Sequence, residues 1–277
     1  VALENFALNL DKGILGLLGP NGAGKSTLMQ ILATITEPTA GKVFWKDKNI
    51  IRHPNVIRKV LGYLPQNFGV YPNLNAIEFL EYIASIKGLA KKGIKKRINR
   101  LLKTLNLFEV RKRALKSYSG GMKQRIGIAQ ALINDPDLLI VDEPTVGLDP
   151  AERIGLLNLL SNLARDRIII LSTHIVTDIE SIATEIALIK EGNLLMDVKP
   201  EELLQKVENK VWELIIPSNK VPEVKEKYTI SGTKLETDGL RVRIVDETSP
   251  GQRAHSVNPT LEDAYLYAMS RNDRGDH

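Results

Sequence analysis

The amino-acid sequence predicts an α/β fold in which a sheet domain carries an inserted helical subdomain and is followed by a small α+β appendage. Strand-like apolar segments alternate with helix-like patterns near the start of the chain, and this alternation returns after about residue 138. Between residues 73 and about 134 the patterns are mainly helical. After about residue 210 the apolar pattern changes again. We therefore expect a sheet domain with its helical subdomain over residues 1–210 and a small accessory domain over residues 211–277.

The first part of the chain contains a clear strand–turn–helix unit. Ile14–Leu18 is a continuous apolar run, typical of a buried strand, and it ends in a glycine-rich turn. The segment Lys25–Ile35 is expected to be a helix, because its apolar residues recur at helical spacing. These residues are Leu28, Ile31, Leu32 and Ile35. Further strands are expected at Val43–Trp45 and Val60–Leu64.

The helical block is expected to hold three helices. The third begins at the Ser119-Gly-Gly segment and extends toward Pro136. The first two each carry an apolar stripe, formed by Ile77, Leu80, Ile83 and Ala84 in one and by Ile94, Ile98, Leu101, Leu102 and Leu105 in the other.

The alternation that follows contains a helix start with a clear signal, because Asp149 is a good N-cap and Pro150 suits the first helical position. Residues 190–193 predict a turn between two strands. The strands expected in this part are Leu138–Val141, Ile168–Leu171, Ile186–Ile189 and Leu194–Met196.

The appendage combines strands with a final helix. Strands are expected at Val211–Ile216 and Leu240–Val245, and Asp238-Gly239 predicts a type I′ hairpin turn. Thr260 and Asp263 resemble a capping box, with Asp in the place of Glu or Gln. The apolar stripe of the helix that they open is Leu261, Ala264, Tyr265 and Ala268.

Composition excludes several classes of protein. The 277 residues are 43% apolar and 26% charged, which is ordinary globular usage rather than that of a disordered chain. No apolar stretch approaches the roughly 20 residues that a membrane-spanning helix needs. The chain has no cysteine, so disulfides and thiolate chemistry are absent. No signal peptide is visible. The first residue, Val1, is not an initiator methionine, so we expect further residues upstream.

A net charge of +5 owes much to a basic run at residues 87–100. We interpret this basic run as the solvated face of a helix rather than as a binding surface. Nucleic-acid binding would require aromatic or arginine-rich recognition features nearby, and the sequence has none there, so no nucleic-acid partner is expected.

The glycine-rich turn is a phosphate-binding motif. Residues 19–27 read GPNGAGKST and fit the pattern G-x-x-x-x-G-K-[ST]. Glycines let the backbone approach phosphate oxygens, and the following helix directs its positive end toward them. Lys25 would contact the β and γ phosphates and Ser26 would bind Mg²⁺. Together with the strand before it and the helix after it, the motif predicts the sheet domain of a P-loop NTPase. The residues expected to bind nucleotide here are Gly19, Pro20, Asn21, Gly22, Ala23, Gly24, Lys25, Ser26 and Thr27.

Two carboxylates follow the apolar strand Leu138–Val141. The carboxyl end of a strand in an open α/β sheet is where ligands bind. Asp142 would hold Mg²⁺ through water, and Glu143 would accept a proton from the attacking water. A second anion site is expected at Ser119, Gly120 and Gly121, where a hydroxyl and exposed N–H groups open a helix.

These motifs, taken in order, resemble the ATP-binding subunit of an ABC transporter. The motifs are GPNGAGKST, Gln66 in GYLPQN, YSGGMKQR, LLIVDEP, GLDP and His174 in LSTH, and they cover residues 1 to about 210. The resemblance implies an Mg²⁺-dependent ATPase that forms a head-to-tail homodimer. Each ATP would lie between the phosphate loop of one copy and the Ser119-Gly-Gly segment of the other.

The resemblance also assigns roles that the residues alone do not. Gln66 would contact Mg²⁺ and communicate with a membrane partner, and Asp149 would lie across the dimer interface. His174 would contact the γ-phosphate and act with Glu143 and Lys25 in catalysis. The stretch from Gln66 through Phe68 and Val70 to Tyr71 is expected to form part of a docking cleft for the permease, although Phe68 and Tyr71 could instead only cover the helical subdomain.

The sequence departs from the family pattern at two points. Tyr118 and Met122 replace the first and last residues of the common signature Leu-Ser-Gly-Gly-Gln, while the residues that face phosphate are intact. The aromatic residue that stacks on adenine has no match here and is expected upstream of Val1.

The Tyr118 and Met122 form of the signature, together with an appendage that ends in Pro259-Thr-Leu-Glu-Asp263, resembles subunits of bacterial exporters whose permease is a separate chain. We therefore expect a peripheral protein on the cytoplasmic face of the cell membrane that powers export of an unidentified substrate. The alternative is a soluble ABC-type ATPase that is not coupled to transport, for example in translation. Those proteins usually carry two nucleotide domains, and no second phosphate loop occurs in this sequence.

Overall fold

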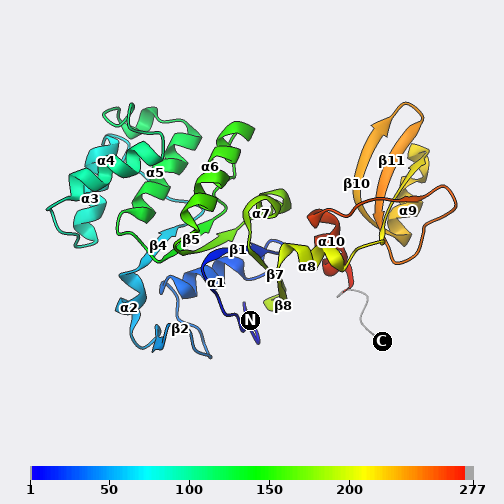
Figure 1. Cartoon of the computed structure of the whole chain (residues 1–277), viewed down its shortest axis with the longest axis horizontal. Helices are drawn as coiled ribbons and strands as arrows, with labels where there is room; N and C mark the ends of the chain where they lie inside the picture. Colours follow the sequence, from blue (N-terminus) through cyan, green and yellow to red (C-terminus); the bar gives the residue numbers. More distant parts are fainter. Residues whose placement is uncertain (1, 272–277) are drawn as a thin grey trace. The chain divides into compact units, whose positions relative to one another are not determined.

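The computed structural model describes residues 2–271, and these form two compact units (Figure 1). The first unit runs to His174 and includes residues 181–196, whereas the second comprises residues 175–180 and the chain from Asp197 onward. No helix among the described residues is both long and apolar enough to cross a membrane. The predicted accessory domain over 211–277 lies within the second unit, and its separate role stays a prediction.

A six-stranded sheet organises the first unit. Its strand order is β4-β5-β6-β1-β7-β8, and the paired strands from β4 through β7 are parallel. The strands are β1 (Gly13–Leu18), β4 (Leu61–Leu64), β5 (Leu138–Asp142), β6 (Ile168–Ser172), β7 (Glu185–Lys190) and β8 (Asn193–Val198). Strands β1 and β5 are buried along their whole length, which explains their continuous apolar runs. The predicted α/β fold is confirmed.

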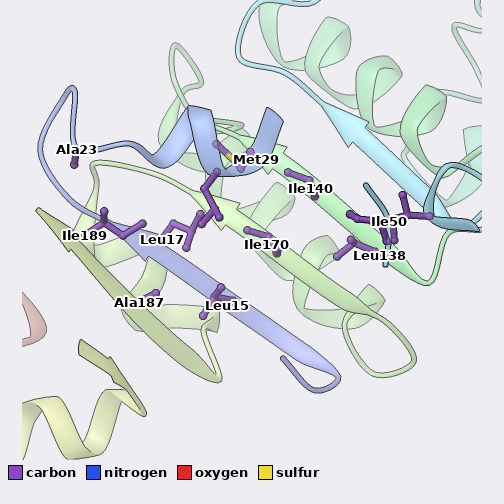
Figure 2. Packing of buried hydrophobic residues seen from close by; sticks show 12 residues of the cluster. Leu15, Leu17, Ala23, Met29, Ile50, Leu138, Ile140, Ile170, Ala187 and Ile189 are labelled. Carbon is purple, nitrogen blue, oxygen red and sulfur yellow. The ribbon is translucent and has the colours of Figure 1, made fainter. Parts of the chain in front are cut away.

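The main core lies between this sheet and helix α1 (Lys25–Leu32). Figure 2 shows Met29 of α1 above side chains of three neighbouring strands, among them Leu17, Ile140 and Ile170. The predicted helix end at Ile35 is wrong. Thr34 has φ +57°, a left-handed conformation that ends the helix, and Ile35 is 62% exposed.

The helical subdomain is inserted between β4 and β5. It contains α3 (Ala76–Ile86), α4 (Ile94–Thr104), the 3₁₀ turn η1 (Leu115–Ser117) and α5 (Gly120–Leu132). In α3 the fully buried stripe is Ala76, Phe79, Leu80 and Ala84, whereas the predicted Ile77 and Ile83 are half-buried. Helix α5 ends at Leu132, before the predicted limit at Pro136.

Smaller elements complete the first unit. A short hairpin is formed by β2 (Phe44–Trp45) and β3 (Lys48–Asn49), and α2 (Pro54–Arg58) precedes β4. Helix α6 (Pro150–Leu163) begins as predicted, because the Asp149 carboxylate accepts a hydrogen bond from the Glu152 N–H at 2.8 Å. Helix α7 (Val176–Ile182), most of which belongs to the second unit, follows β6.

The second unit is built on a four-stranded sheet in the order β10-β11-β9-β12 with antiparallel pairing. Its elements are α8 (Pro200–Gln205), β9 (Val211–Ile216), η2 (Ser218–Lys220), α9 (Val221–Lys227), β10 (Thr229–Glu236), β11 (Gly239–Val245), β12 (His255–Ser256) and α10 (Leu261–Arg271). The hairpin between β10 and β11 is confirmed, but its turn is not type I′. Gly239 already pairs with Glu236, and neither Thr237 nor Asp238 has the positive φ that a type I′ turn requires.

The predicted capping box of the last helix is confirmed. The Thr260 N–H donates to Asp263 Oδ2 at 2.7 Å, and the Asp263 N–H donates to Thr260 Oγ1 at 3.3 Å. Tyr267 rather than the predicted Tyr265 belongs to the buried face of this helix.

Candidate active site

The phosphate loop connects β1 to α1, and two of its glycines are required by close packing. A Cβ at Gly19 would overlap the Ile189 carbonyl oxygen, and a Cβ at Gly24 would overlap the Ala2 carbonyl oxygen. Gly24 is also the N-cap of α1 with φ +105°, a conformation that favours glycine. The loop therefore holds the N-terminus of α1 open toward a pocket, where backbone N–H groups and the helix dipole favour an anion.

Lys25 is the first residue of α1, and its side chain lies against the phosphate loop. Its side chain is buried, and Nζ donates hydrogen bonds to the carbonyl oxygens of Gly19 at 2.7 Å and Pro20 at 3.0 Å. Burial lowers the pKa of the ammonium group, and the nearby carboxylates of Glu143 and Asp142 oppose that change. The lysine is thus a fixed cation between the loop and the acidic end of β5.

Asp142 is the last residue of β5 and lies beside the start of α1. The Ser26 hydroxyl donates to Asp142 Oδ2 at 3.3 Å. Burial raises the pKa of this carboxyl, whereas the hydroxyls of Ser172 and Ser26 and the charge of Lys25 lower it. A carboxylate and a hydroxyl at this distance are the oxygen ligands that Mg²⁺ takes beside phosphates.

Glu143 has an unusual backbone conformation for a glutamate. Its φ is +50°, and its N–H donates to the Ser172 carbonyl oxygen at 2.9 Å. Such left-handed residues cost free energy and gather at functional sites. Here the turn places the side chain, which is 9% exposed, with Oε2 at 2.9 Å from His174 Nδ1. The histidine therefore fixes the orientation of the carboxylate.

These groups surround one pocket of about 190 Å³. The structure brings together residues that the sequence predicted from three separate segments, and adds two that it missed, Ala2 and Ser172. The lining residues are Ala2, Asn21, Gly22, Ala23, Gly24, Lys25, Ser26, Thr27, Gln66, Asp142, Glu143 and Ser172. Ser172 could have been found from the adjacent strands, since it is the register partner of Asp142 across β5 and β6.

Other predicted site residues do not line this pocket. Ser119 is instead the N-cap of α5, where its hydroxyl accepts from the Met122 N–H at 3.2 Å. Gly120 and Gly121 form the first turn of α5, and Asp149 caps α6. Gly19 and Pro20 begin the loop, and their carbonyl oxygens accept hydrogen bonds from Lys25 Nζ, but neither residue lines the pocket. Within one chain, the two predicted anion sites are therefore separate.

No cluster of three or more His, Asp or Glu side chains suited to a metal occurs among residues 2–271. Ser26, Asp142 and Gln66 nevertheless lie around the same pocket, each with a side-chain oxygen. This sparse oxygen set fits Mg²⁺, which keeps several waters and is usually completed by the phosphates of a substrate.

Comparisons with known proteins agree with this geometry. A family model described as "ABC transporter" matches residues 3–146. The chain is 33% identical over 280 residues to an uncharacterised ABC transporter ATP-binding protein, YxlF of Bacillus subtilis, covering 96% of this chain and 93% of YxlF. It is 34% identical over 244 residues to the bacitracin transport ATP-binding protein BcrA of Bacillus licheniformis, covering 86% of this chain and 78% of BcrA.

Solved structures show the same architecture. An ATP-binding subunit of an ABC transporter superposes with a TM-score of 0.66 at 28% identity, covering 74% of this chain and 86% of that one. The cassette MJ0796, solved as a dimer in a post-hydrolysis state with ADP and Pi, gives a TM-score of 0.64 at 28% identity, covering 72% of this chain and 90% of MJ0796.

Proposed function

Because the chain belongs to the ABC transporter family, whose ATP-binding subunits hydrolyse ATP, we propose that it powers export through a separate membrane permease. Two copies close around two ATP molecules, and hydrolysis lets them separate again. The observation that carries this proposal is the placement of the Glu143 carboxylate, oriented by His174, beside the pocket that Lys25, Ser26 and Asp142 surround.

The phosphate loop binds the ATP phosphates. Backbone N–H groups of the loop and the positive end of α1 favour the negative charge, and the Lys25 ammonium adds a cation at the β and γ phosphates. Ser26, Asp142 and Gln66 would hold Mg²⁺. When bound, the ion would neutralise charge that develops on the phosphate oxygens during hydrolysis.

Glu143 acts as the general base for water. Its carboxylate accepts the proton as the water attacks the γ-phosphate, and the contact with His174 Nδ1 holds the acceptor in one orientation. The strained backbone at Glu143 contributes to this preorganisation, because the turn directs the side chain back toward the loop.

A second copy completes the site. In one chain, Ser119, Gly120 and Gly121 do not line the nucleotide pocket, and we assign them to the pocket of a partner. The dimeric MJ0796 structure supports this arrangement. Asp149, exposed at the start of α6, would lie at the same interface.

The permease binds near α3. Tyr71 and Tyr82 are 51% and 43% exposed, and their rings meet edge to face with centroids 5.2 Å apart. Ile86, one turn beyond Tyr82, is 65% exposed. Exposed apolar side chains of this kind are typical of interface anchors. The predicted contribution of Phe68 is weaker, because its ring packs against Gly127 of α5. Docking there would place the chain on the cytoplasmic face of the membrane.

Mixed dimers test the shared site directly. Lys25→Ala and Ser119→Arg chains carry different tags. A homodimer of either variant has no intact site, because both of its sites carry the substitution. When mixed with ATP, they can form one intact site, from Lys25 of one chain and Ser119 of the other. We expect ATP-dependent capture of one tag by the other, and none between two differently tagged Lys25→Ala chains. ATP hydrolysis that is strictly first order in protein and unaffected by Ser119→Arg would contradict the dimer.

A further inference from the structure

A second pocket, of about 240 Å³, lies in the first unit away from the nucleotide site. It is lined by three cations of the basic run at 87–100, namely Lys96, Arg97 and Arg100 of α4, and by Arg167, which precedes β6. Residues far apart in the sequence thus gather their positive charges around one concavity. The nucleotide site uses none of them.

Arg167 is held rigidly at the wall of this pocket. Its side chain is 16% exposed, Nε donates to the Leu163 carbonyl at 3.1 Å, and Nη1 donates to the Pro136 carbonyl at 3.1 Å. These two bonds fix the guanidinium plane and leave Nη2 as the group nearest to Asp135, at 3.6 Å.

Among the lining residues of the described chain, one acid faces the four cations. Asp135 is 70% exposed and lies 3.7 Å from Arg97 Nη2 and 3.6 Å from Arg167 Nη2. These separations exceed the roughly 2.7–2.9 Å of direct charge-assisted hydrogen bonds. Asp135 therefore offsets only part of the positive charge.

Arg97 is held less firmly than Arg167. Its Nη2 donates weakly to the Leu132 carbonyl at 3.4 Å, whereas its Nε is buried and has no hydrogen-bond partner among the residues that the structure describes. A buried donor without a partner is costly, and the protein therefore holds the Arg97 guanidinium only weakly, so its exposed nitrogens can turn toward a ligand in the pocket.

The N-terminus of α4 adds to this field. Gly93, which lines the pocket, is the N-cap of α4, and the helix has neither a side-chain cap nor an acidic residue in its first turn. The positive end of the helix dipole and the cations of that first turn therefore reinforce each other.

We propose that this pocket binds a phosphate-bearing anion. Guanidinium groups match phosphate oxygens in a planar, two-pronged geometry, and three of the four cations are arginines. The excess of positive charge suits a doubly charged phosphate group or a diphosphate. The volume is below the roughly 300–1,000 Å³ of sites for drug-sized ligands, so the pocket takes the phosphate part and not a whole nucleotide. The source is either a free phosphate compound or an acidic phospholipid headgroup.

Calorimetric titration with pyrophosphate, without Mg²⁺, tests the site in a Lys25→Ala background that weakens binding at the phosphate loop. The pocket variant is Lys96→Ala with Arg100→Ala, because both residues are exposed on α4. The matched control is Lys92→Ala with Lys95→Ala, which removes the same charge from the same run outside the pocket lining. We expect at least about tenfold weaker binding in the pocket variant and less than about twofold in the control.

In a second arm, the Lys25→Ala chain, the pocket variant and the control are each tested by flotation with vesicles of phosphatidylcholine that contain phosphatidic acid, a lipid whose headgroup is a phosphomonoester. Pyrophosphate binding that depends on the pocket identifies a free phosphate compound as the source. Vesicle binding that depends on the pocket, without pyrophosphate binding, identifies a lipid headgroup. Equal losses in the pocket variant and the control would show only general electrostatic attraction and would overturn the proposal, as would the absence of pocket-dependent binding in both arms.

Discussion

The carboxylate of Glu152 lies directly against Gly121, so that a Cβ added at Gly121 would overlap the carboxylate oxygens. Glu152 is in the first turn of α6, and Gly121 is in the first turn of α5. The Ser119 hydroxyl is 3.5 Å from Glu152 Oε1. Helix α5, which is expected to receive the partner's phosphate, therefore carries a carboxylate from its own chain at its positive end. This placement stabilises the Glu152 carboxylate and the start of α5.

This contact predicts unequal effects of alanine at two adjacent glycines. Gly121→Ala should destabilise the chain by up to about 1 kcal/mol, because the methyl group forces the Glu152 carboxylate, the far end of a flexible side chain, away from the start of α5. Gly120→Ala should be neutral or slightly stabilising, since the nearest atom to its Cβ, the Gly147 carbonyl oxygen, is 3.9 Å away. Urea unfolding followed by circular dichroism measures both changes.

The cause of the Gly121→Ala loss can be tested with a double variant. Adding Glu152→Ala removes the overlapping group, so it should recover most of the stability lost in Gly121→Ala. If Gly121→Ala is as harmless as Gly120→Ala, or if Glu152→Ala adds a further full loss, the overlap does not limit the packing of these helices.

The second unit should depend on one buried ion pair. The Asp263 side chain is 1% exposed, and Arg243 Nη2 donates to its Oδ2 at 2.7 Å. Burial alone would raise the pKa of Asp263, but Arg243, Ser231 and Thr260 lower it overall. Asp263→Asn should therefore destabilise this unit by about 3 kcal/mol, because it leaves the Arg243 charge without its main partner.

The same lowered pKa fixes the pH dependence. The stabilisation by Asp263 is present above its unfolded-state pKa of 3.8 and is lost as the pH falls through the lower folded-state pKa. Trp212 fluorescence in a Trp45→Phe background reports unfolding of this unit. Glu262→Gln removes a neighbouring exposed carboxylate and should change stability by less than about 0.5 kcal/mol. Equal stabilities of Asp263→Asn and Glu262→Gln would contradict a structural role for the pair.

The proposed permease surface predicts a loss of membrane recruitment without a loss of ATP binding. Tyr82→Glu places a charge among exposed apolar side chains on α3 and should reduce the share of chain recovered with washed membranes of its native cell. Phe44→Glu is a matched control, because Phe44 is 57% exposed on β2, outside the proposed surface. Retention of Tyr82→Glu on membranes to the same extent as Phe44→Glu would mean that the tyrosines do not bind the permease.

Much of the fold followed from local patterns. The buried strands and the capped helix starts at Asp149 and Thr260 depend on residues close in sequence, and the sequence predicted them. The predictions failed where a single backbone angle decides the outcome. Thr34 ends α1 through a positive φ that no apolar pattern reveals, and the hairpin turn at Asp238 does not adopt the conformation that its dipeptide favours.

The site was predicted where a motif encodes it and missed where tertiary contacts make it. The phosphate loop is one continuous segment, and so is the acidic end of β5. The residues of each could therefore be named in advance. Ser172 and Ala2 reach the pocket only because β6 lies beside β5 and because the N-terminal segment packs on Gly24. The contact of the Glu152 carboxylate with Gly121 likewise joins two helices that no local pattern relates.

Glu143→Gln gives the sharpest test of the catalytic assignment. Glutamine keeps the shape of the side chain and can still contact His174 and water, but it cannot take up a proton at neutral pH. Hydrolysis should fall by about 10²–10⁴-fold, the range expected for the loss of a general base. ATP binding should persist, because Lys25, Ser26 and Asp142 are unchanged. The γ-phosphate is then retained, so size-exclusion chromatography with Mg-ATP should show a long-lived dimer.

Glu191→Gln is the matched control for this test. Glu191 also follows a strand and also has a positive φ, +49°, but it is absent from the lining of the nucleotide pocket. It should hydrolyse ATP at the parent rate, because a strained glutamate is catalytic only where its carboxylate reaches the attacking water. Normal turnover in Glu143→Gln would mean that Glu143 has no catalytic role and is only a carboxylate at the end of a strand. A variant that loses hydrolysis but stays monomeric at saturating ATP would keep the base and reject the closed dimer, since the two conclusions depend on different residues.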